Sequence, residues 1–231
     1  MGENIYLTGE YIARNPLYHI EDSPWKAGQV LKMLNKHNLE IATMCEVGCG
    51  AGEILRQLQL LMPEEVVFDG YDISPQAFRL SEQRANDRLR FFCEDFLSKT
   101  INPFDVLLCI DVFEHVEDCI GFLRNLREKA KYKLFHIPLD MSVQTVLRCA
   151  PIVQSRRTVG HLHYFMKETA LLTLQDAGYD IMDYFYTPGG IDRGTTLKSK
   201  LAKLPRLVFS LINQDLTVRI LGGYSLLVLA T

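Results

Sequence analysis

Three glycines at alternate positions mark the segment of the chain best suited to binding a ligand. Gly48, Gly50 and Gly52 lie in EVGCGAGE, at 46–53. Because glycine has no side chain, a ligand can approach such a turn closely, and a following helix supplies free N–H groups. A G-x-G-x-G pattern alone also serves any tight turn from a strand into a helix. The segment therefore indicates a strand, a turn and a helix, with a candidate cofactor site on the turn.

Two acidic residues follow at the predicted ends of the next strands. Asp72 comes 20 residues after Gly52, where a carboxylate can accept hydrogen bonds from ribose hydroxyls. It could instead help to cap the next helix, which begins near Pro75. Ile73 could pack on an adenine face. Asp95 could accept a hydrogen bond from an adenine amino group, although a lone acid after a strand is usually a surface turn residue.

Two classes of nucleotide cofactor fit these residues, dinucleotides and S-adenosylmethionine. A dinucleotide places a pyrophosphate on the turn and favours the spacing G-x-G-x-x-G. Here the third glycine comes one residue earlier, and Glu46 immediately precedes the turn. An acidic residue in that place suits a cationic ligand better than a pyrophosphate. The spacing therefore favours S-adenosylmethionine over a nicotinamide dinucleotide.

Three histidines, His115, His161 and His163, are candidates for a general base. His115 follows the predicted fourth strand, at the carboxyl edge where doubly wound sheets bind ligands, although it could equally link that loop to its helix. His161 and His163 share one face if their segment is extended. No third metal ligand is evident beside them, so we predict no metal site. His136 has apolar neighbours and is expected to be a core histidine.

The elements that position these residues alternate between predicted strands and helices. Ser23 and Pro24 start a helix that runs to about Lys36, with Ser23 at the N-cap. Five apolar runs predict strands, and helical spacing appears between them. The strands are at 41–47, 66–71, 89–93, 104–110 and 132–137, and the helices are at 54–61, 75–84 and 122–126. This alternation indicates an α/β fold with a parallel, doubly wound sheet.

The last third of the chain differs from this pattern. Residues 139–167 are predicted to be a connection, followed by a helix at 167–176 that ends at Gly178. Strands are predicted at 179–186 and 224–230, on either side of a long insertion at 187–220. Two late strands joined by an insertion can form an antiparallel pair at one edge of a parallel sheet.

Composition limits the classes of protein that the chain can belong to. Its 231 residues are 48% hydrophobic and 23% charged, with a net charge of -3, so we expect a globular protein without a basic field for nucleic acid. Six cysteines occur without C-x-x-C pairs or zinc-like spacing. We predict neither a secretory signal nor a membrane span. The expected location is the cytoplasm, with reduced thiols.

Five segments, in this order, resemble the class I S-adenosylmethionine-dependent methyltransferases: EVGCGAGE, GYDISPQA, FFCEDF, FDVLLCIDVFEHVED and YSLLVLAT. The resemblance runs from about residue 24 to the end of the chain. It implies one domain over 1–231, with a mostly parallel, Rossmann-like sheet of seven strands whose last strand is antiparallel. DVFEHVED is similar to the small-molecule branch of the family. No NPPY-type tetrapeptide occurs, which disfavours DNA or protein-amide substrates.

The resemblance also implies a set of cofactor-binding residues. Asp72 would hold the ribose hydroxyls, Ile73 would flank adenine, and Asp95 with Phe96 would contact the adenine edge. The remaining residues would line the methionine and ribose parts of S-adenosylmethionine: Glu46, Gly48, Cys49, Gly50, Gly52, Ile110, Asp111 and Val112. The product would be S-adenosylhomocysteine.

The expected reaction is methyl transfer to a small acceptor, such as a hydroxyl of a metabolite, a sugar or a lipid-linked intermediate. One of the three candidate histidines would act as the base. Two other functions remain open: a nicotinamide-dependent oxidoreductase on a similar sheet, and a cofactor-binding protein without catalytic activity. Fold does not fix the acceptor atom, which could be oxygen, nitrogen or carbon.

The resemblance is least specific for the residues on the substrate side. Residues 1–36 would form a lid and the first helix, with Tyr11 and Tyr18 as lid residues and Tyr164 near the substrate. Residues 139–167 and 187–220 would be substrate-side insertions. The segment 191–220 carries six basic and two acidic residues among apolar ones. It is either a lid helix with a solvated basic face or a surface for a membrane or a lipid-linked substrate.

Overall fold

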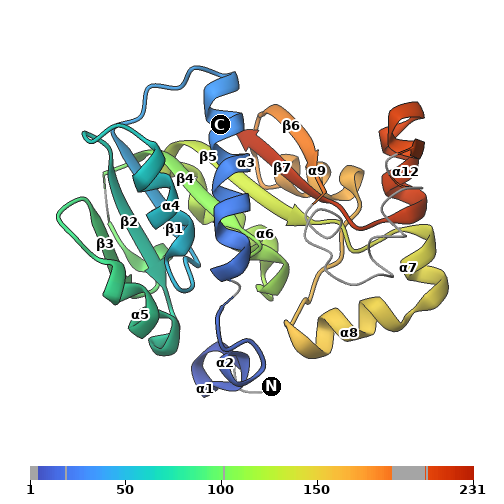
Figure 1. Ribbon diagram of the computed structural model, residues 1–231, viewed down its shortest axis with the longest axis horizontal. Coiled ribbons are helices and arrows are strands. Elements are labelled where there is room, and N and C mark those ends of the chain that lie inside the picture. The colour runs from blue at the N-terminus through green and yellow to red at the C-terminus, as the bar shows by residue number, and fades with distance from the viewer. Residues whose placement is uncertain (1–4, 19, 101, 189–205, 207) are drawn as a thin grey trace.

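A seven-stranded sheet forms the centre of the protein (Figure 1). The computed structural model describes residues 5–18, 20–100, 102–188, 206 and 208–231. The strand order is β3-β2-β1-β4-β5-β7-β6, and β7 runs antiparallel to both of its neighbours. The strands are β1 (Thr43–Val47), β2 (Val67–Asp72), β3 (Leu89–Cys93), β4 (Phe104–Ile110), β5 (Ala130–Pro138), β6 (Ile181–Thr187) and β7 (Ser225–Ala230). The predicted mostly parallel sheet with an antiparallel last strand is confirmed.

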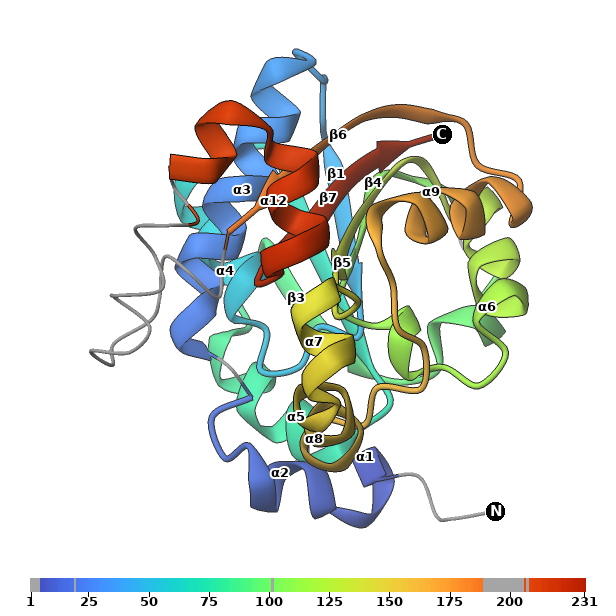
Figure 2. The same cartoon turned by 90° about the vertical axis from the view of Figure 1, so that its right-hand side faces the viewer.

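Helices cover both faces of this sheet (Figure 2). One face carries α3 (Ser23–Lys36), α4 (Glu53–Leu61) and α5 (Pro75–Ser81), and the other carries α6 (Cys119–Leu126) and α9 (Lys167–Asp176). In β4, Val106 and Leu108 pack toward α3 and α4, whereas Leu107 packs toward α6. Strands buried on both faces are apolar throughout, which explains the continuous apolar runs of the sequence.

Single-turn 3-10 helices adjust several of these boundaries. They are η1 (Ile20–Asp22), η2 (Glu82–Arg84), η3 (Phe96–Ser98), η4 (Phe113–His115) and η5 (Arg127–Lys129). The prediction that Ser23 is the N-cap of the first long helix is wrong, because η1 runs directly into α3. Asp22 occupies the N-cap position without a capping side-chain bond, and Ser23 is buried inside the first turn.

The connection at 139–167 contains two helices that the sequence pattern did not predict, α7 (Val143–Arg148) and α8 (Ala150–Thr158). Ser142 and Thr145 form a capping box at the start of α7. Cys149, with a φ of 57°, separates the two helices. Neither helix buries a residue fully. The apolar residues of α7, Val143, Val146 and Leu147, are exposed, and six residues are too few to show a helical period.

The N-terminal helices α1 (Ile5–Thr8) and α2 (Glu10–Arg14) lie beside α8, below the carboxyl ends of the parallel strands (Figures 1 and 2). The Arg14 guanidinium donates a 2.7 Å hydrogen bond to the carbonyl of Arg157. The hydroxyl of Tyr6 donates one of 3.1 Å to the carbonyl of Val159. These contacts join residues 5–18 to α8 and the residue after it, at the edge where ligands bind in such sheets.

The predicted insertion at 187–220 lies largely outside the described residues. Its described part includes a helical stretch at 208–212 and α12 (Gln214–Leu221), which packs on α7. Among the described residues, the helices are all too short or too polar to cross a membrane. All six cysteines are free thiols.

Candidate functional site

Two loops meet where β1 and β4 lie side by side, and the chain leaves these strands in opposite directions. In open α/β sheets, ligands bind in the crevice outside the carboxyl ends of two such strands. The glycine turn follows β1, and residues 111–115 follow β4. A Cβ added to Gly48 would lie 2.7 Å from Cγ2 of Val112. The two loops are therefore in direct contact and form the centre of the candidate site.

The glycine turn has a backbone that other residues would adopt only with strain. Gly48, Gly50 and Gly52 have φ values of 69°, 54° and 74°, in the left-handed region that glycine enters without cost. A Cβ added to Gly52 would lie 2.4 Å from the ring of Phe91. The alternate glycines of the sequence are thus required by the turn itself, and they leave its main chain uncovered by side chains of its own.

Asp72 holds the glycine turn to the start of α5. Its carboxylate accepts 2.8 Å hydrogen bonds from the backbone N–H groups of Gly50 and Ser74. Burial raises the pKa of Asp72, and these bonds oppose the rise. Asp72 therefore also fills the alternative role considered for it, because it holds Ser74 at the start of α5. Each carboxylate oxygen keeps a second lone pair that could accept a ribose hydroxyl. Ile73 beside it is 43% exposed, at the rim of the crevice.

Glu46 is buried beneath the turn, with only 1% of its surface exposed. One of its oxygens, Oε2, has no hydrogen-bond partner among the described residues. Burial raises the pKa of Glu46 well above its ordinary value, and only Lys26 among the named causes opposes this. An unpartnered buried oxygen is costly, so a ligand that donates a hydrogen bond here would relieve that cost.

Lys26 is a site residue that the sequence reading missed. Its ammonium lies 2.7 Å from Oδ2 of Asp111, and the second oxygen of Asp111 accepts a 2.6 Å bond from Nδ1 of His136. His136 and Lys26 hold the pKa of Asp111 far below its usual range. The sequence contains a signal for this role, because Lys26 lies at helical spacing from the apolar residues Val30 and Met33, which are buried. A lysine in an apolar stripe needs a buried partner.

The predicted core role of His136 is confirmed. It is 4% exposed, and its Nε2 lies 2.9 Å from the hydroxyl of Thr187. Asp111, which it orients, has a φ of 54°. A non-glycine residue in this conformation is strained and is often found at functional sites.

The residues expected to line the adenine edge and the inner turn differ in how far their side chains are exposed. The Asp95 side chain accepts a 3.0 Å bond from the N–H of Leu97 and caps η3. Phe96 is 2% exposed, and its ring packs 4.8 Å from that of Tyr71. Only the backbone of Phe96 is therefore available to a ligand. Burial raises the pKa of the Cys49 thiol, and Ile110 is also buried.

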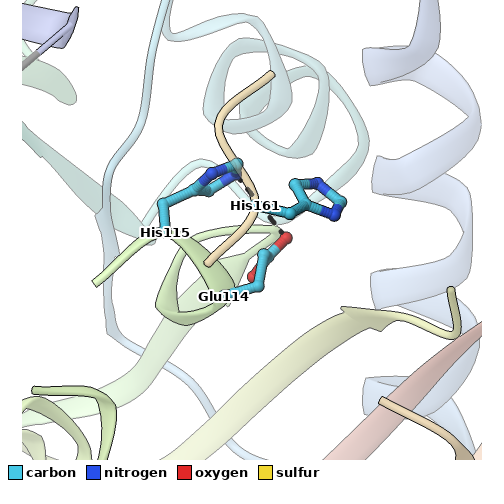
Figure 3. A group of neighbouring side chains, drawn as sticks. All are labelled: Glu114, His115 and His161. Carbon is cyan, nitrogen blue, oxygen red and sulfur yellow. Dashed lines mark ion pairs between the residues drawn. The ribbon is translucent and has the colours of Figure 1, made fainter. Parts of the chain in front are cut away.

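Glu114 and His115, from η4 after β4, gather with His161 (Figure 3). Glu114 is fully buried, and neither of its carboxylate oxygens has a hydrogen-bond partner among the described residues. The rings of His115 and His161 meet edge to face, with centroids 4.9 Å apart. Burial and the neighbouring His161 lower the pKa of His115 to about 4. Nδ1 of His161 donates a 2.5 Å bond to Oδ2 of Asp140.

His161 and His163 have different hydrogen-bond partners. Residues 160–166 form no strand, because the N–H groups of Leu162 and His163 both bond to the carbonyl of Glu114. His163 donates from Nε2 to the carbonyl of Val116, at 2.8 Å, and so has partners different from those of His161. The hydroxyl of Tyr164 bonds to the carbonyl of His161, which places Tyr164 in the loop as a support.

A row of tyrosines connects the two sides of the crevice. Ring centroids of Tyr6 and Tyr11 are 4.8 Å apart, those of Tyr11 and Tyr18 are 5.1 Å apart, and Tyr6 lies 5.7 Å from His115. At the far end, the hydroxyl of Tyr18 lies 3.0 Å from that of Ser74. A Cβ added to Gly50 would lie 3.5 Å from the Tyr18 ring. The N-terminal segment thus lies over the turn, and Tyr6 joins the two tyrosines that the sequence analysis selected.

Comparison with known proteins gives the context of this site. A family model for a methyltransferase domain matches residues 45–132. No curated protein shows significant sequence similarity to the chain. The matched span runs from β1 through the glycine turn, Asp72, Asp95 and the Glu114–His115 loop into β5, so it contains most of the proposed cofactor site.

Many solved structures match this fold, among them three with bound S-adenosylhomocysteine. Magnesium protoporphyrin IX methyltransferase from Synechocystis, with bound S-adenosylhomocysteine, has a TM-score of 0.60 at 18% identity, covering 90% of this chain and 82% of that one. The N-methyltransferase NodS from Bradyrhizobium japonicum, also with S-adenosylhomocysteine, has a TM-score of 0.61 at 15% sequence identity, and the match covers 98% of both chains. An S-adenosylmethionine-dependent methyltransferase from Thiobacillus denitrificans, with the same ligand, gives 0.62 at 14%, covering 96% and 97%.

The expectation of a methyltransferase is confirmed by the domain and by the fold. Strand order, the antiparallel last strand and the glycine turn after β1 agree with the resemblance seen in the sequence. Residues 45–132 are a methyltransferase domain, and the chain has the fold of the class I S-adenosylmethionine-dependent methyltransferases.

Proposed function

We propose that this protein transfers the methyl group of S-adenosylmethionine to a hydroxyl of a small molecule, with S-adenosylhomocysteine as the second product. The observation that carries the proposal is the turn between β1 and α4. Its three left-handed glycines leave the backbone open beside an acidic strand end, and a methyltransferase domain spans it. Neighbours of the same fold hold S-adenosylhomocysteine.

The cofactor would lie along the carboxyl edge of the sheet, from β3 to β4. Asp72 would accept hydrogen bonds from the ribose hydroxyls, and Ile73 would cover adenine, with Asp95 and the Phe96 backbone at its edge. The methionine end would face the backbone of 110–112. The unpartnered oxygen of Glu46 is a suitable acceptor for the cationic amino group of methionine.

Methyl transfer requires little covalent chemistry from the protein. The acceptor oxygen attacks the methyl carbon as the carbon–sulfur bond breaks, so alignment of the two molecules supplies most of the acceleration, about 7–11 kcal/mol for well-oriented reactants. A hydroxyl must also lose its proton. His115 and His161 stand where the acceptor would lie, whereas His163 is a weaker candidate because one ring nitrogen already bonds to Val116.

We place the acceptor at a cavity of about 250 Å³ that includes Asp140, the hydrogen-bond partner of His161. Pro138, Asp140, Thr145, Ile152 and Tyr224 are among its lining residues. Asp140 connects it directly to His161 through the 2.5 Å hydrogen bond. A larger cavity, of about 510 Å³, is lined by Glu53, directly after the glycine turn, and by Arg56 and Asn86. The position of the smaller cavity supports α7 and α8 as the substrate-side segment.

The N-terminal segment would act as a lid in this single domain. Tyr18 packs against the turn and bonds to Ser74, so residues 5–18 must move for the cofactor to enter. We place Tyr11 and Tyr18 over the bound cofactor and Tyr164 behind the acceptor.

The described part of the C-terminal insertion supports an apolar or lipid-linked acceptor. Leu211 and Ile212 are 88% and 78% exposed, close in sequence to the basic residues of 191–206. We propose that this segment contacts a membrane surface from the cytoplasmic side. Sedimentation with anionic vesicles at low salt tests this. The wild-type chain should bind, Leu211→Ser should bind more weakly, and equal binding by both would contradict the proposal.

The proposed reaction is tested by following S-adenosylhomocysteine formation with matched hydroxyl and amine acceptors of similar size. Turnover with hydroxyl compounds is expected, with a loss of at least about 100-fold in His115→Ala or His161→Ala, because general bases contribute about 10²–10⁴. Turnover confined to amines would reject a hydroxyl acceptor. Unchanged rates in both variants would reject the catalytic role of the histidines.

A further inference from the structure

Glu114, His115 and His161 form a cluster with an unusual set of unsatisfied atoms. Each offers one ligand atom, and these atoms all lie within 4.8 Å of one another. Both Glu114 oxygens and Nδ1 of His115 are buried without a hydrogen-bond partner among the described residues. Oε1 of Glu114 is 3.8 Å from Nε2 of His115, which is too long for a hydrogen bond. Both carboxylate oxygens of Glu114 therefore lack a donor among the described residues.

Lys26, a cation whose charge acts on Glu114, is engaged with another carboxylate. Lys26 pairs with Asp111 at 2.7 Å. A buried carboxylate without donors is costly, and a bound cation would remove that cost. A cation bound at the cluster would contact carboxylate oxygens that have no donor among the described residues.

The hydrogen bond of His161 points to the nature of that cation. Its Nδ1 donates to Asp140, so Nε2 is the nitrogen left to face Glu114 and His115. A carboxylate that holds the far nitrogen of a histidine fixes the ring for metal binding, and this arrangement is usual behind metal-ligating histidines. Two imidazoles and one carboxylate are the donor set of many sites for Zn²⁺ or Fe²⁺.

We propose that Glu114, His115 and His161 bind a divalent transition-metal ion such as Zn²⁺, Fe²⁺, Co²⁺ or Mn²⁺. Tetrahedral ligand atoms that each lie about 2.1 Å from one ion are about 3.4 Å apart, so a pair of atoms at the 4.8 Å limit must close by about 1.4 Å. Mg²⁺ prefers oxygen ligands and ideal octahedral geometry, and the two nitrogens disfavour it.

If the proposed function holds, the ion would act on the acceptor hydroxyl. Three protein ligands leave open positions, as in catalytic metal sites. A hydroxyl bound there loses its proton more readily. Its oxygen then forms the new bond to the methyl carbon, the carbon–sulfur bond breaks, and the proton is released to water. His115 and His161 would then position the ion rather than take the proton themselves.

The experiment uses the full-length chain, freed of metal with a chelator and titrated with Zn²⁺, Co²⁺ and Mg²⁺ by calorimetry. One equivalent of Zn²⁺ or Co²⁺ should bind much more tightly than Mg²⁺, and bound Co²⁺ should give visible absorption bands. His115→Ala and His161→Ala should each weaken Zn²⁺ binding by at least about 100-fold. Asp140→Asn should weaken it by about 10–100-fold.

The matched control is His37→Asn. His37 also bonds to a carboxylate, Asp183, at 2.7 Å, but outside this cluster, so its loss should leave Zn²⁺ binding unchanged. Each variant is also titrated with S-adenosylhomocysteine, which reports both folding and the proposed cofactor site. Absence of stoichiometric Zn²⁺ binding, or binding unaffected by either histidine substitution, would overturn the metal site. Loss of S-adenosylhomocysteine binding alone would count against the proposed function and leave the metal site standing.

Discussion

At the scale of single residues, the site is built from buried acids whose charges are compensated to different extents. Asp111 has two cationic partners, Lys26 and His136. Glu46 has Lys26 nearby but one free oxygen, and Glu114 has no partner for either oxygen among the described residues. The two carboxylates with unpartnered oxygens are thus those proposed to bind a cation: Glu46 the amino group of the cofactor, and Glu114 a metal ion.

Glu46 should make the free energy of unfolding depend on pH. Burial raises its pKa in the folded state well above that of the unfolded chain. Its contribution to stability is therefore full below the unfolded pKa and is lost as pH rises toward the folded value. The glutamine of Glu46→Gln does not titrate. The free energy of unfolding of this variant should therefore increase relative to that of the wild type as pH rises from about 4.5, by at most about 1.4 kcal/mol per pH unit.

Urea unfolding at pH 4.5, 6 and 8 measures this difference. The exposed Glu117→Gln serves as the control and should show a small difference that does not change with pH. A constant difference for Glu46→Gln across the same range would mean that Glu46 is ionised in the folded protein.

At the scale of elements, the turn between β1 and α4 depends on glycine for both conformation and space. In Gly48→Ala, a left-handed residue would cost about 1–2 kcal/mol, and its Cβ would meet Val112 at 2.7 Å. The unfolding free energy and the affinity for S-adenosylhomocysteine should both fall. Gly28, within α3, has no heavy atom within 4 Å of an added Cβ. Gly28→Ala should therefore stabilise the protein by about 0.5–1 kcal/mol and leave the affinity unchanged.

Denaturant unfolding and calorimetry of the two variants check this pair. If both alanine variants were stable and bound S-adenosylhomocysteine alike, the turn would not be the part of the protein that binds the cofactor.

The N-terminal segment provides a kinetic test at the same scale. Tyr18→Phe removes the hydroxyl that bonds to Ser74, a contact worth about 1 kcal/mol. The open state should become more populated, and the association rate constant for S-adenosylhomocysteine should rise by up to about fivefold. Stopped-flow fluorescence of Trp25, the only tryptophan, follows binding. Tyr132→Phe, in β5, is the control and should not change the rate. An unaltered rate in Tyr18→Phe would contradict the lid.

At the scale of the whole molecule, local pattern predicted the sheet well, because its strands are buried on both faces and read as apolar runs. The bounds of β3, β4 and α9 agree with those predicted. The α7–α8 pair was missed since neither helix has a buried stripe. The Lys26–Asp111 and His161–Asp140 pairs were also missed, because they join residues 85 and 21 positions apart and depend on tertiary packing that no local pattern encodes.

The central claim is that the crevice between the β1 and β4 loops binds S-adenosylmethionine, and calorimetric titration with S-adenosylhomocysteine tests it most directly. Binding is expected, whereas NADH should not bind. Asp72→Ala should weaken binding at least about tenfold through the lost ribose hydrogen bonds. Asp105→Ala is the matched control, because Asp105 also accepts two 2.8 Å backbone bonds, from Ala42 and Thr43, but at the opposite end of β1. Binding of NADH but not of S-adenosylhomocysteine, or equal affinities in the two variants, would contradict the account.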